Sequence, residues 1–184
     1  MVGYICVGVL LAVIIIAVIC FYNKVIKLKI CVDEAFATMD VYLKKRADMI
    51  PNLVETVKGF AVHEREIFAN ADRVISTWNG NEKDRTTRFQ SEEDMARTLK
   101  DIKFLSERYP QIRANENFLM LQKNLQSVET EIANARKYYN GVVNTYNSSI
   151  QTFPANIIAK LLGFKKEKMF MGTEWDRENV RISF

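Results

Sequence analysis

Few residues in this sequence have the types and spacing that catalysis or metal binding needs. The single histidine, His63, is flanked by Glu64 and Glu66, a combination that could supply a general base or a metal ligand. A zinc-binding helix needs two histidines on one face, and a nucleophilic site needs a serine or cysteine paired with the histidine. Neither pattern is present, so we interpret His63 as a solvated residue on a helix.

The acidic clusters and the glycines also lack the spacing of a ligand site. Asp33-Glu34 and Glu92-Glu93-Asp94 do not match a calcium loop, and helix starts or solvated helix faces explain them better. The seven glycines form no phosphate-binding loop. The sequence therefore predicts no catalytic, cofactor-binding or metal-binding residues, and a protein that is not an enzyme.

An uncharged apolar run near the N-terminus predicts a membrane-spanning helix. The run extends from Ile5 to Tyr22, and at about 1.5 Å rise per residue it covers about 27 Å, close to the roughly 30 Å hydrocarbon core of a bilayer. No basic region precedes it and no small-residue cleavage site ends it, which disfavours a cleaved signal peptide. Membrane-spanning positions along the run are Ile5, Val9, Val13, Ile16 and Phe21.

The charges beside this run predict its orientation. Lys24, Lys27 and Lys29 follow the run at once, whereas only the terminal amine precedes it. Because lysine and arginine resist translocation, we expect a single-pass protein with its N-terminus outside and its C-terminal part in the cytoplasm. Cys31 is the one cysteine beyond the span, so the large C-terminal part has no pair for a structural disulfide.

Apolar residues after the span repeat with the period of long helices. Alternating spacings of three and four residues run from Val25 to Tyr42, a seam typical of a coiled coil or a bundle helix. The same rhythm runs from Phe118 to Tyr146, and Asn115 stands where the N-cap of that helix would be. Two long helices, early and late in the chain, follow from this pattern.

Two further helices are predicted between them. Pro51 suits the first turn of a helix that extends to about Trp78, and the polar residues 79–91, with an Asn79-Gly80-Asn81 helix stop, form the main loop. A capping box that begins at Ser91 opens a shorter helix, which ends near Tyr109.

The predicted fold is all-α. It consists of an N-terminal single transmembrane helix followed by an antiparallel bundle of long helices, of the four-helix type, because such helices cannot bury their apolar stripes alone. The expected organisation is an anchor at residues 1–22, a helical bundle at 23–152, and an amphipathic or irregular C-terminal tail at 153–184.

Several stretches resemble the bacterial LemA family. They are VDEAF at 32–36, RADMIPNLVETVKGFA at 46–61, YPQIRANENF at 109–118, ARKYYN at 135–140 and FPAN at 153–156. The resemblance covers residues 22–170 in family order, although residues 73–103 depart from the family sequence and are more charged. It implies a single N-terminal span, a cytoplasmic helical domain and bacterial origin, hence the inner membrane, but no settled biochemical activity.

The first seam offers a candidate oligomer interface at Leu28, Val32 and Met39. A long helix that continues from the span could present this face to neighbouring copies. Changing Leu28 or Val32 to Asp is then expected to disperse an assembly while the fold survives.

Polar residues around Pro51 offer a candidate partner surface. Asp48, Asn52 and Glu55 lie where the first and second predicted helices meet, close to the basic residues 44–46. Two interpretations stay open: capping with exposed salt bridges, worth about 1 kcal/mol or less, or a contact surface for an unidentified membrane protein at the tip of the hairpin.

Asparagine and tyrosine side chains alternate along the last long helix. They are Asn134, Asn140, Asn144 and Asn147 with Tyr138, Tyr139 and Tyr146. Such groups can fix the register of a bundle or form a subunit interface, and the sequence leaves both interpretations open.

The residues after Pro154 predict a contact with the membrane surface. Apolar residues lie near one side of a short helix, with lysines around them: Ile157, Ile158, Leu161, Leu162, Phe164, Lys165 and Lys166. The alternative is that these apolar residues cap the open end of the bundle. The net charge of +4 suits anionic lipid but is too diffuse to indicate nucleic acid.

Two classes of function fit these features. The first is a non-enzymatic scaffold that self-assembles as a homo-oligomer at the cytoplasmic face of the membrane, with membrane lipid as a partner. The second is a signalling or recruiting adaptor for a membrane protease or a sensor system. The sequence contains no feature that identifies such a partner.

Overall fold

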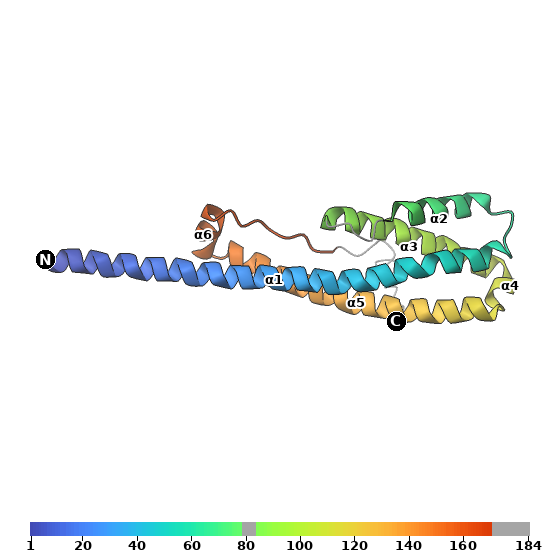
Figure 1. Ribbon diagram of the computed structural model, residues 1–184, viewed down its shortest axis with the longest axis horizontal. Helices are drawn as coiled ribbons and strands as arrows, with labels where there is room; N and C mark the ends of the chain where they lie inside the picture. Colours follow the sequence, from blue (N-terminus) through green and yellow to red (C-terminus); the bar gives the residue numbers. More distant parts are fainter. Residues whose placement is uncertain (79–83, 171–184) are drawn as a thin grey trace, which may run out of the picture. The chain divides into compact units, whose positions relative to one another are not determined.

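In the computed structural model, which describes residues 1–78 and 84–170, every regular element is a helix (Figure 1). The helices are α1 (Val2–Lys58), α2 (Arg65–Thr77), α3 (Arg85–Arg108), α4 (Pro110–Arg113), α5 (Glu116–Gln151) and α6 (Ala155–Leu161). The described residues contain no strand, so the all-α prediction is confirmed.

The chain divides into two compact units. Unit 1 comprises residues 1–37 and 137–169, and unit 2 comprises residues 38–136 with Phe170 among the described residues. Helices α1 and α5 each contribute one part to unit 1 and the other to unit 2. The domain boundaries expected at residues 22 and 152 stay predictions, and residues 171–184 of the expected tail lie outside the described residues.

Helix α1 continues through Pro51, which corrects the prediction that Pro51 opens a second helix. A proline inside a helix costs about 3 kcal/mol, because it removes a hydrogen bond and crowds the preceding turn. Pro51 itself is exposed, while Ile50, Leu53 and Val57 beside it are buried, so packing on the core side compensates. The chain instead turns at residues 59–64, which places His63 in this turn and not on a helix.

Helix α3 begins earlier than the sequence pattern predicts. Its N-cap is Asp84, whose carboxylate accepts a 2.9 Å hydrogen bond from the backbone N–H of Thr87. Ser91 lies inside the helix, and its hydroxyl donates to the carbonyl of Thr87, so it caps nothing. The predicted stop at residues 79–81 lies outside the described residues.

The start of helix α5 confirms the predicted cap. The backbone N–H of Phe118 donates a 3.0 Å hydrogen bond to the side-chain oxygen of Asn115. Phe118, Val128 and Ile132 are buried along this helix, as their spacing predicts. Helix α3 ends at Arg108, near the expected position, but the single turn α4 was not anticipated.

The seam of α1 is used inside the chain. Val32 and Met39 both have 0% of their surface exposed, and Leu28 is half-buried. In unit 1 the ring of Phe36 packs edge-on against Tyr139 of α5, with centroids 5.9 Å apart. Val32 and Met39 therefore have no exposed surface that a second copy could contact. They were predicted as interface residues because the seam was expected to face neighbouring copies, and their burial within the chain corrects that expectation.

Val32→Asp is accordingly expected to unfold unit 1 rather than to disperse an assembly. A carboxylate without a partner at this buried position costs about 3 kcal/mol or more. Ile30→Asp is the matched control, because Ile30 lies two residues away on the same helix and is exposed. Thermal unfolding of the full-length variants in detergent, followed by circular dichroism, makes the comparison. Equal midpoints for the two variants would contradict the burial of Val32.

Candidate functional site

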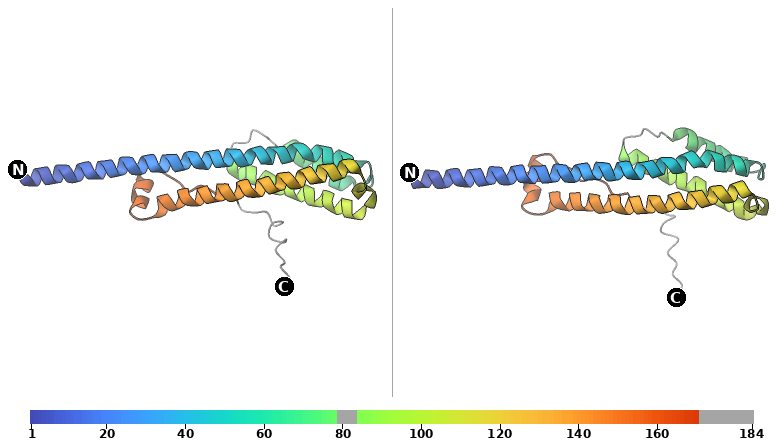
Figure 2. Two further views of the ribbon diagram at one scale, coloured as in Figure 1. Left: turned by 90° about the horizontal axis from the view of Figure 1, so that it is seen from below. Right: turned by 60° about the horizontal axis from the view of Figure 1, so that its bottom comes forward.

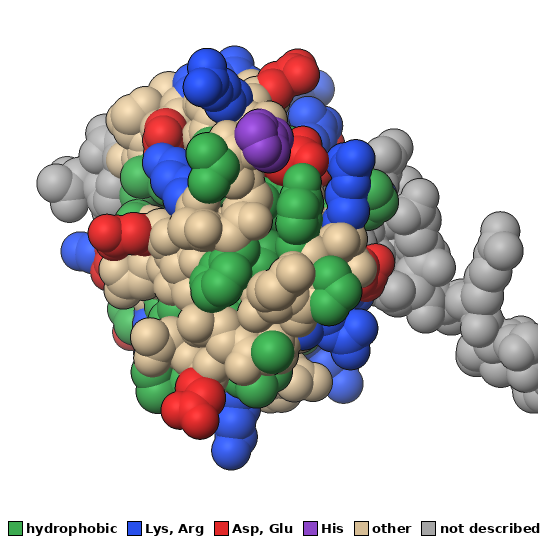
Figure 3. Space-filling view, turned by 90° about the vertical axis from the view of Figure 1, so that its right-hand side faces the viewer, with side chains coloured by type: hydrophobic (Ala, Val, Ile, Leu, Met, Phe, Trp, Pro, Cys, Tyr) green, Lys and Arg blue, Asp and Glu red, His purple; other side chains and the backbone are tan. Residues whose placement is uncertain are grey.

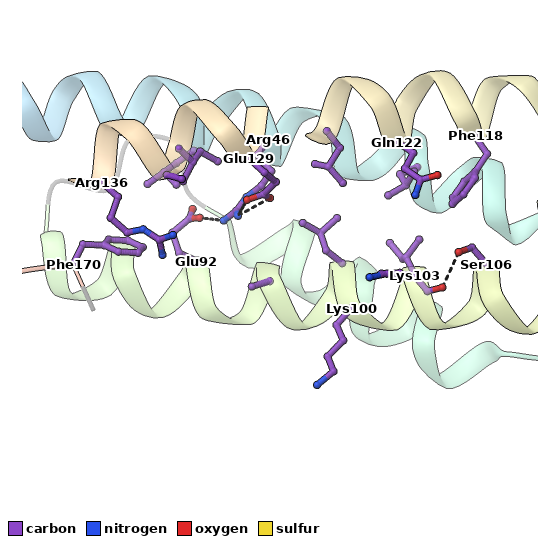
Figure 4. Close-up of a pocket in the computed structure, with 18 residues that line it drawn as sticks. Arg46, Glu92, Lys100, Lys103, Ser106, Phe118, Gln122, Glu129, Arg136 and Phe170 are labelled. Carbon is purple, nitrogen blue, oxygen red and sulfur yellow. Dashed lines mark hydrogen bonds and ion pairs between the residues drawn. The ribbon is translucent and has the colours of Figure 1, made fainter. Parts of the chain in front are cut away.

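Three charged side chains from three helices form a buried cluster in unit 2 (Figure 4). Arg46 of α1 donates from Nη1 to the two carboxylate oxygens of Glu129 of α5, at 2.9 and 3.2 Å. Its Nη2 donates to Oε2 of Glu92 of α3. Arg46 is buried, Glu92 is only 1% exposed and the Glu129 side chain is 40% exposed, so this ionic cluster ties α1, α3 and α5 together with Glu129 on its solvent side.

A second buried arginine lies one turn earlier on α3. Arg88 pairs with Asp40 of α1, with 2.9 Å between Nε and Oδ1. Its guanidinium carbon lies 4.4 Å from the centre of the Trp78 ring, within range of a cation–π interaction. Arg88 and Glu92 are separated by four residues, so they share one face of α3 and direct two charges of opposite sign into unit 2.

A cavity of about 310 Å³ adjoins the ionic cluster. In Figure 4, Arg136 and Phe170 lie toward one end of it and Phe118 and Gln122 toward the other. The Arg136 guanidinium stands 5.4 Å from the centre of the Phe170 ring. The apolar part of the lining consists of Leu43, Leu53, Ala96, Leu99, Ile102, Phe118, Leu125, Ile132, Ala133 and Phe170. The cavity thus combines an apolar wall with a charged region.

Burial controls the ionisation of this cluster. Burial removes the Glu92 carboxyl from water and raises its pKa to about 7. The positive charges of Arg46 and Arg88 lower this pKa, but by less than burial raises it. Burial would lower the pKa of Arg46, but the charges of Glu92 and Glu129 together raise it. Burial also raises the pKa of Asp40 against the opposing effects of Arg88 and Lys44. The cluster therefore changes its net charge near neutral pH.

The charged groups of this arrangement mainly stabilise the packing of the helices in unit 2. Its carboxylates face guanidinium groups, and the Ser106 hydroxyl on the cavity wall donates to the backbone carbonyl of Lys103. Among residues 1–78 and 84–170, no group of three or more histidine, cysteine, aspartate or glutamate side chains could hold a metal ion. Arg46, Glu92 and Glu129 thus bind one another, and an apolar space lies beside them.

The members of this cluster do not stand out in the sequence as a site. There, Arg46 is one of the basic residues 44–46, and Glu92 belongs to an acidic cluster that a helix start or a solvated helix face explains. A signal was nevertheless present, because Arg46 continues the core rhythm of Met39 and Leu43 toward Ile50, all three of which are buried. A charged residue at a core position of a seam indicates a buried ionic partner on a neighbouring helix.

The predicted partner surface lies apart from the cavity lining. Asp48, Asn52 and Glu55 are exposed, and their spacings of four and three place them on one face of α1. They do not form a hairpin tip, since α1 continues past them to Lys58. This exposed polar face of α1 stays a candidate contact surface.

The predicted membrane-surface residues belong to unit 1, and their exposure differs. Leu161 is 85% exposed, Ile157 and Leu162 are also exposed, and Ile158 and Phe164 are half-buried. Lys165 and Lys166, predicted to accompany them, are exposed as well.

The tyrosines and one asparagine of α5 have a role that neither sequence interpretation included. The hydroxyls of Tyr139 and Tyr146 donate to the carbonyls of Lys168 and Lys165, at 2.7 and 3.0 Å. The amide of Asn147 both donates to the carbonyl and accepts from the N–H of Glu167, each at 2.9 Å. These side chains hold the segment after α6 along α5.

The N-terminal part of α1 fits a membrane-anchored protein. Helix α1 contains a window with a mean hydropathy of 3.1, and no residue of that window is buried in the structure. Ile5, Val9, Val13 and Ile16 are exposed, and Phe21 is half-buried. A core helix of the same composition would be mostly buried, so the exposed apolar surface fits a lipid environment.

The LemA family profile matches residues 35–184 of this chain. The chain belongs to the LemA family. A protein named Protein LemA from Metamycoplasma hominis is 22% identical over 152 residues, which are 83% of this chain and 69% of that protein. The magnetosome proteins MamQ 1 and MamQ 2 of Paramagnetospirillum magneticum are each 34% identical over 64 residues, 35% of this chain and 24% of their own length. The chain thus spans about a quarter of these two relatives.

The family match includes the parts of all three helices, α1, α3 and α5, that contribute residues to the buried cluster of this LemA family protein. Arg46, Arg88, Glu92 and Glu129 all lie within the matched residues 35–184.

Glu92→Gln is expected to change how stability depends on pH. The pKa of Glu92 rises from its ordinary 4.5 to about 7 on folding, so the folded state binds the proton more tightly. The resulting stabilisation is present below about pH 4.5 and is lost as the pH rises through about 7, a difference of about 3 kcal/mol. The variant should match the wild type near pH 4 and exceed it near pH 8.

Chemical unfolding of full-length protein at several pH values measures this difference. Glu93→Gln is the matched control, because Glu93 is the next residue and pairs with Arg97 at the surface. It should leave the pH dependence unchanged. A wild-type stability that rises between pH 5 and 8 relative to Glu92→Gln would contradict the raised pKa.

Proposed function

We propose that this LemA family protein is a non-enzymatic scaffold that is anchored in the membrane by α1 and assembles with copies of itself through one end of unit 2. The observation that carries the proposal is a group of exposed apolar side chains at this end. The group, here called the end face, consists of Phe60, Val62, Leu119 and Met120. Phe60 and Val62 lie in the turn after α1, and Leu119 and Met120 lie in the first turns of α5.

Contacts within unit 2 hold the segments at this end together. Glu64, at the end of the turn, accepts a 2.9 Å hydrogen bond from the hydroxyl of Tyr109 and pairs with Arg108 at 3.2 Å. Figure 1 shows the α1–α2 turn, α4 and the start of α5 at the same end of unit 2. In Figure 3, which faces this end, hydrophobic side chains lie at the surface among charged ones.

The composition of the end face supports protein association. Val62 is 63% exposed, and the other three side chains are exposed as well, so none of them completes the core of unit 2. Exposed apolar side chains bordered by polar ones are typical of association surfaces, where their burial removes apolar area from water. A two-fold interface would use the same face on both copies.

A second candidate function is that of an adaptor for a membrane protease or a sensor. The polar face formed by Asp48, Asn52 and Glu55 favours it, because these exposed residues carry two negative charges on one face of α1. A partner with basic residues would complement this face. In this case a different protein, and not a second copy, binds unit 2.

The self-assembly proposal predicts a discrete multimer of full-length protein in mild detergent or lipid nanodiscs. Phe60→Asp with Val62→Asp should reduce the mass to that of a smaller species, because two charges on each copy would face each other across a two-fold interface. The helical content should be unchanged, since both positions are exposed. Mass photometry or light scattering with multi-angle detection measures the outcome.

Val41→Asp provides the control for this experiment. Val41 is as exposed as Val62 and belongs to unit 2, but it lies on α1 far along the chain from the α1–α2 turn. This variant should keep the mass of the wild type. A monomer for the wild type would overturn self-assembly, and a multimer that survives the double substitution would overturn the end face as its interface.

A further inference from the structure

The segment around α6 leaves a set of apolar side chains exposed in unit 1. Phe153, before the helix, and Leu161, at its end, are exposed over more than four-fifths of their surface, at 81% and 85%. Ile157 and Leu162 are exposed too, whereas Ala159 on the other side of the helix is buried. Helix α6 therefore directs one side into unit 1 and the other, apolar side outward.

This exposure is not the result of a loosely attached chain end. The segment that follows α6 is held by Tyr146, which donates to the carbonyl of Lys165, and by the paired hydrogen bonds between Asn147 and Glu167. Lys29 of α1 also pairs with Glu167 at 3.2 Å. Contacts to both α1 and α5 thus fix the segment in place while its apolar side chains stay outside.

The attachment places this segment beside the end of the apolar run. The ring of Phe164 lies against the ring of Tyr22, with centroids 5.9 Å apart, and Tyr22 is the last residue of the run. Figures 1 and 2 show α6 crosswise to α1. A helix that crosses a bilayer runs roughly along its normal, so a crosswise helix at the end of the span lies along the membrane surface.

The charges around the segment match the same location. Lys160, Lys165 and Lys166 are exposed beside the apolar side chains, and Lys24 and Lys27 are exposed on α1 just after the run. Clustered lysines next to a membrane span attract anionic headgroups, with about 1 kcal/mol for each lysine near the surface. Apolar side chains framed by lysines are typical of helices that lie in the interface of a bilayer.

We propose that the α6 segment is a second membrane contact, which inserts Phe153, Ile157, Leu161 and Leu162 into the headgroup region of the bilayer that α1 spans and prefers anionic lipid. With two contacts, the membrane fixes the rotation of unit 1 about α1, which a single span would leave free. The inference rests on the proposed anchoring by α1 but not on self-assembly through the end face.

The test measures the depth of α6 in full-length protein. Cys6, Cys20 and Cys31 are replaced by alanine, and a single cysteine at Leu161→Cys carries an environment-sensitive fluorophore. The protein is reconstituted in vesicles of phosphatidylcholine with phosphatidylglycerol. A nitroxide lipid that is labelled near its headgroup should quench this fluorophore several-fold more than one at Asn156→Cys, the matched exposed polar position on α6.

Two results would overturn the second contact. A fluorophore at position 161 that is quenched by aqueous iodide and not by the nitroxide lipid would lie in water. One that is protected from both quenchers would be covered by protein, including a second copy. Co-flotation of the protein with the vesicles reports separately on anchoring by α1. A failure of anchoring is therefore distinguishable from a failure of the α6 contact.

The lipid preference is tested with charge variants of the same labelled protein. Removing phosphatidylglycerol should reduce the quenching at position 161, and replacement of Lys160, Lys165 and Lys166 by glutamine should abolish this dependence on anionic lipid. Replacement of the same lysines by arginine should preserve it, because the charge is kept. Quenching that is equal with and without phosphatidylglycerol in the wild type would overturn the preference for anionic lipid.

Discussion

The continuity of helix α1 is the constraint on which the rest of the structure depends. It extends unbroken from Val2 to Lys58, so the exposed apolar run and the buried seam share one helical register. Because the register is shared, the surface of α1 is apolar on all sides along the N-terminal run and apolar on one side along the seam, with no break in the helix between the two. The break that Pro51 would favour does not occur, since the packed residues around it keep the helix intact.

Unit 2 organises its helices around charges as well as apolar side chains. Arg46, Glu92 and Glu129 lie where α1, α3 and α5 meet, and the desolvation cost of these charges is partly offset by their partners. Such a cluster accepts fewer alternative packings than an apolar contact, because each charge is stable only opposite its partner. The raised pKa of Glu92 shows that the compensation is incomplete.

Unit 1 contains both the end of the exposed apolar run of α1 and the segment around α6. Hydrogen bonds from Tyr139, Tyr146 and Asn147 of α5 hold the chain after α6, and the Phe164 ring meets Tyr22 where the apolar run ends. The polar groups of α5 are therefore used within the chain, and the apolar side chains of α6 are left outside. The polar groups used within the chain and the exposed apolar side chains are thus separate sets of residues in unit 1.

The sequence by itself determined what depends on local pattern: the apolar run, the all-α fold, the Asn115 cap of α5 and the family resemblance. These features follow from composition and helical period, which act over a few turns. Only the tertiary structure decided that α1 passes through Pro51, that α3 starts at Asp84, and that Val32 and Met39 face their own chain. The tertiary structure also decided the partners of Arg46 and Tyr146. The partners of Arg46 lie 46 and 83 residues away along the chain, and the partner of Tyr146 lies 19 residues away. Pairing at such separations depends on how the helices pack.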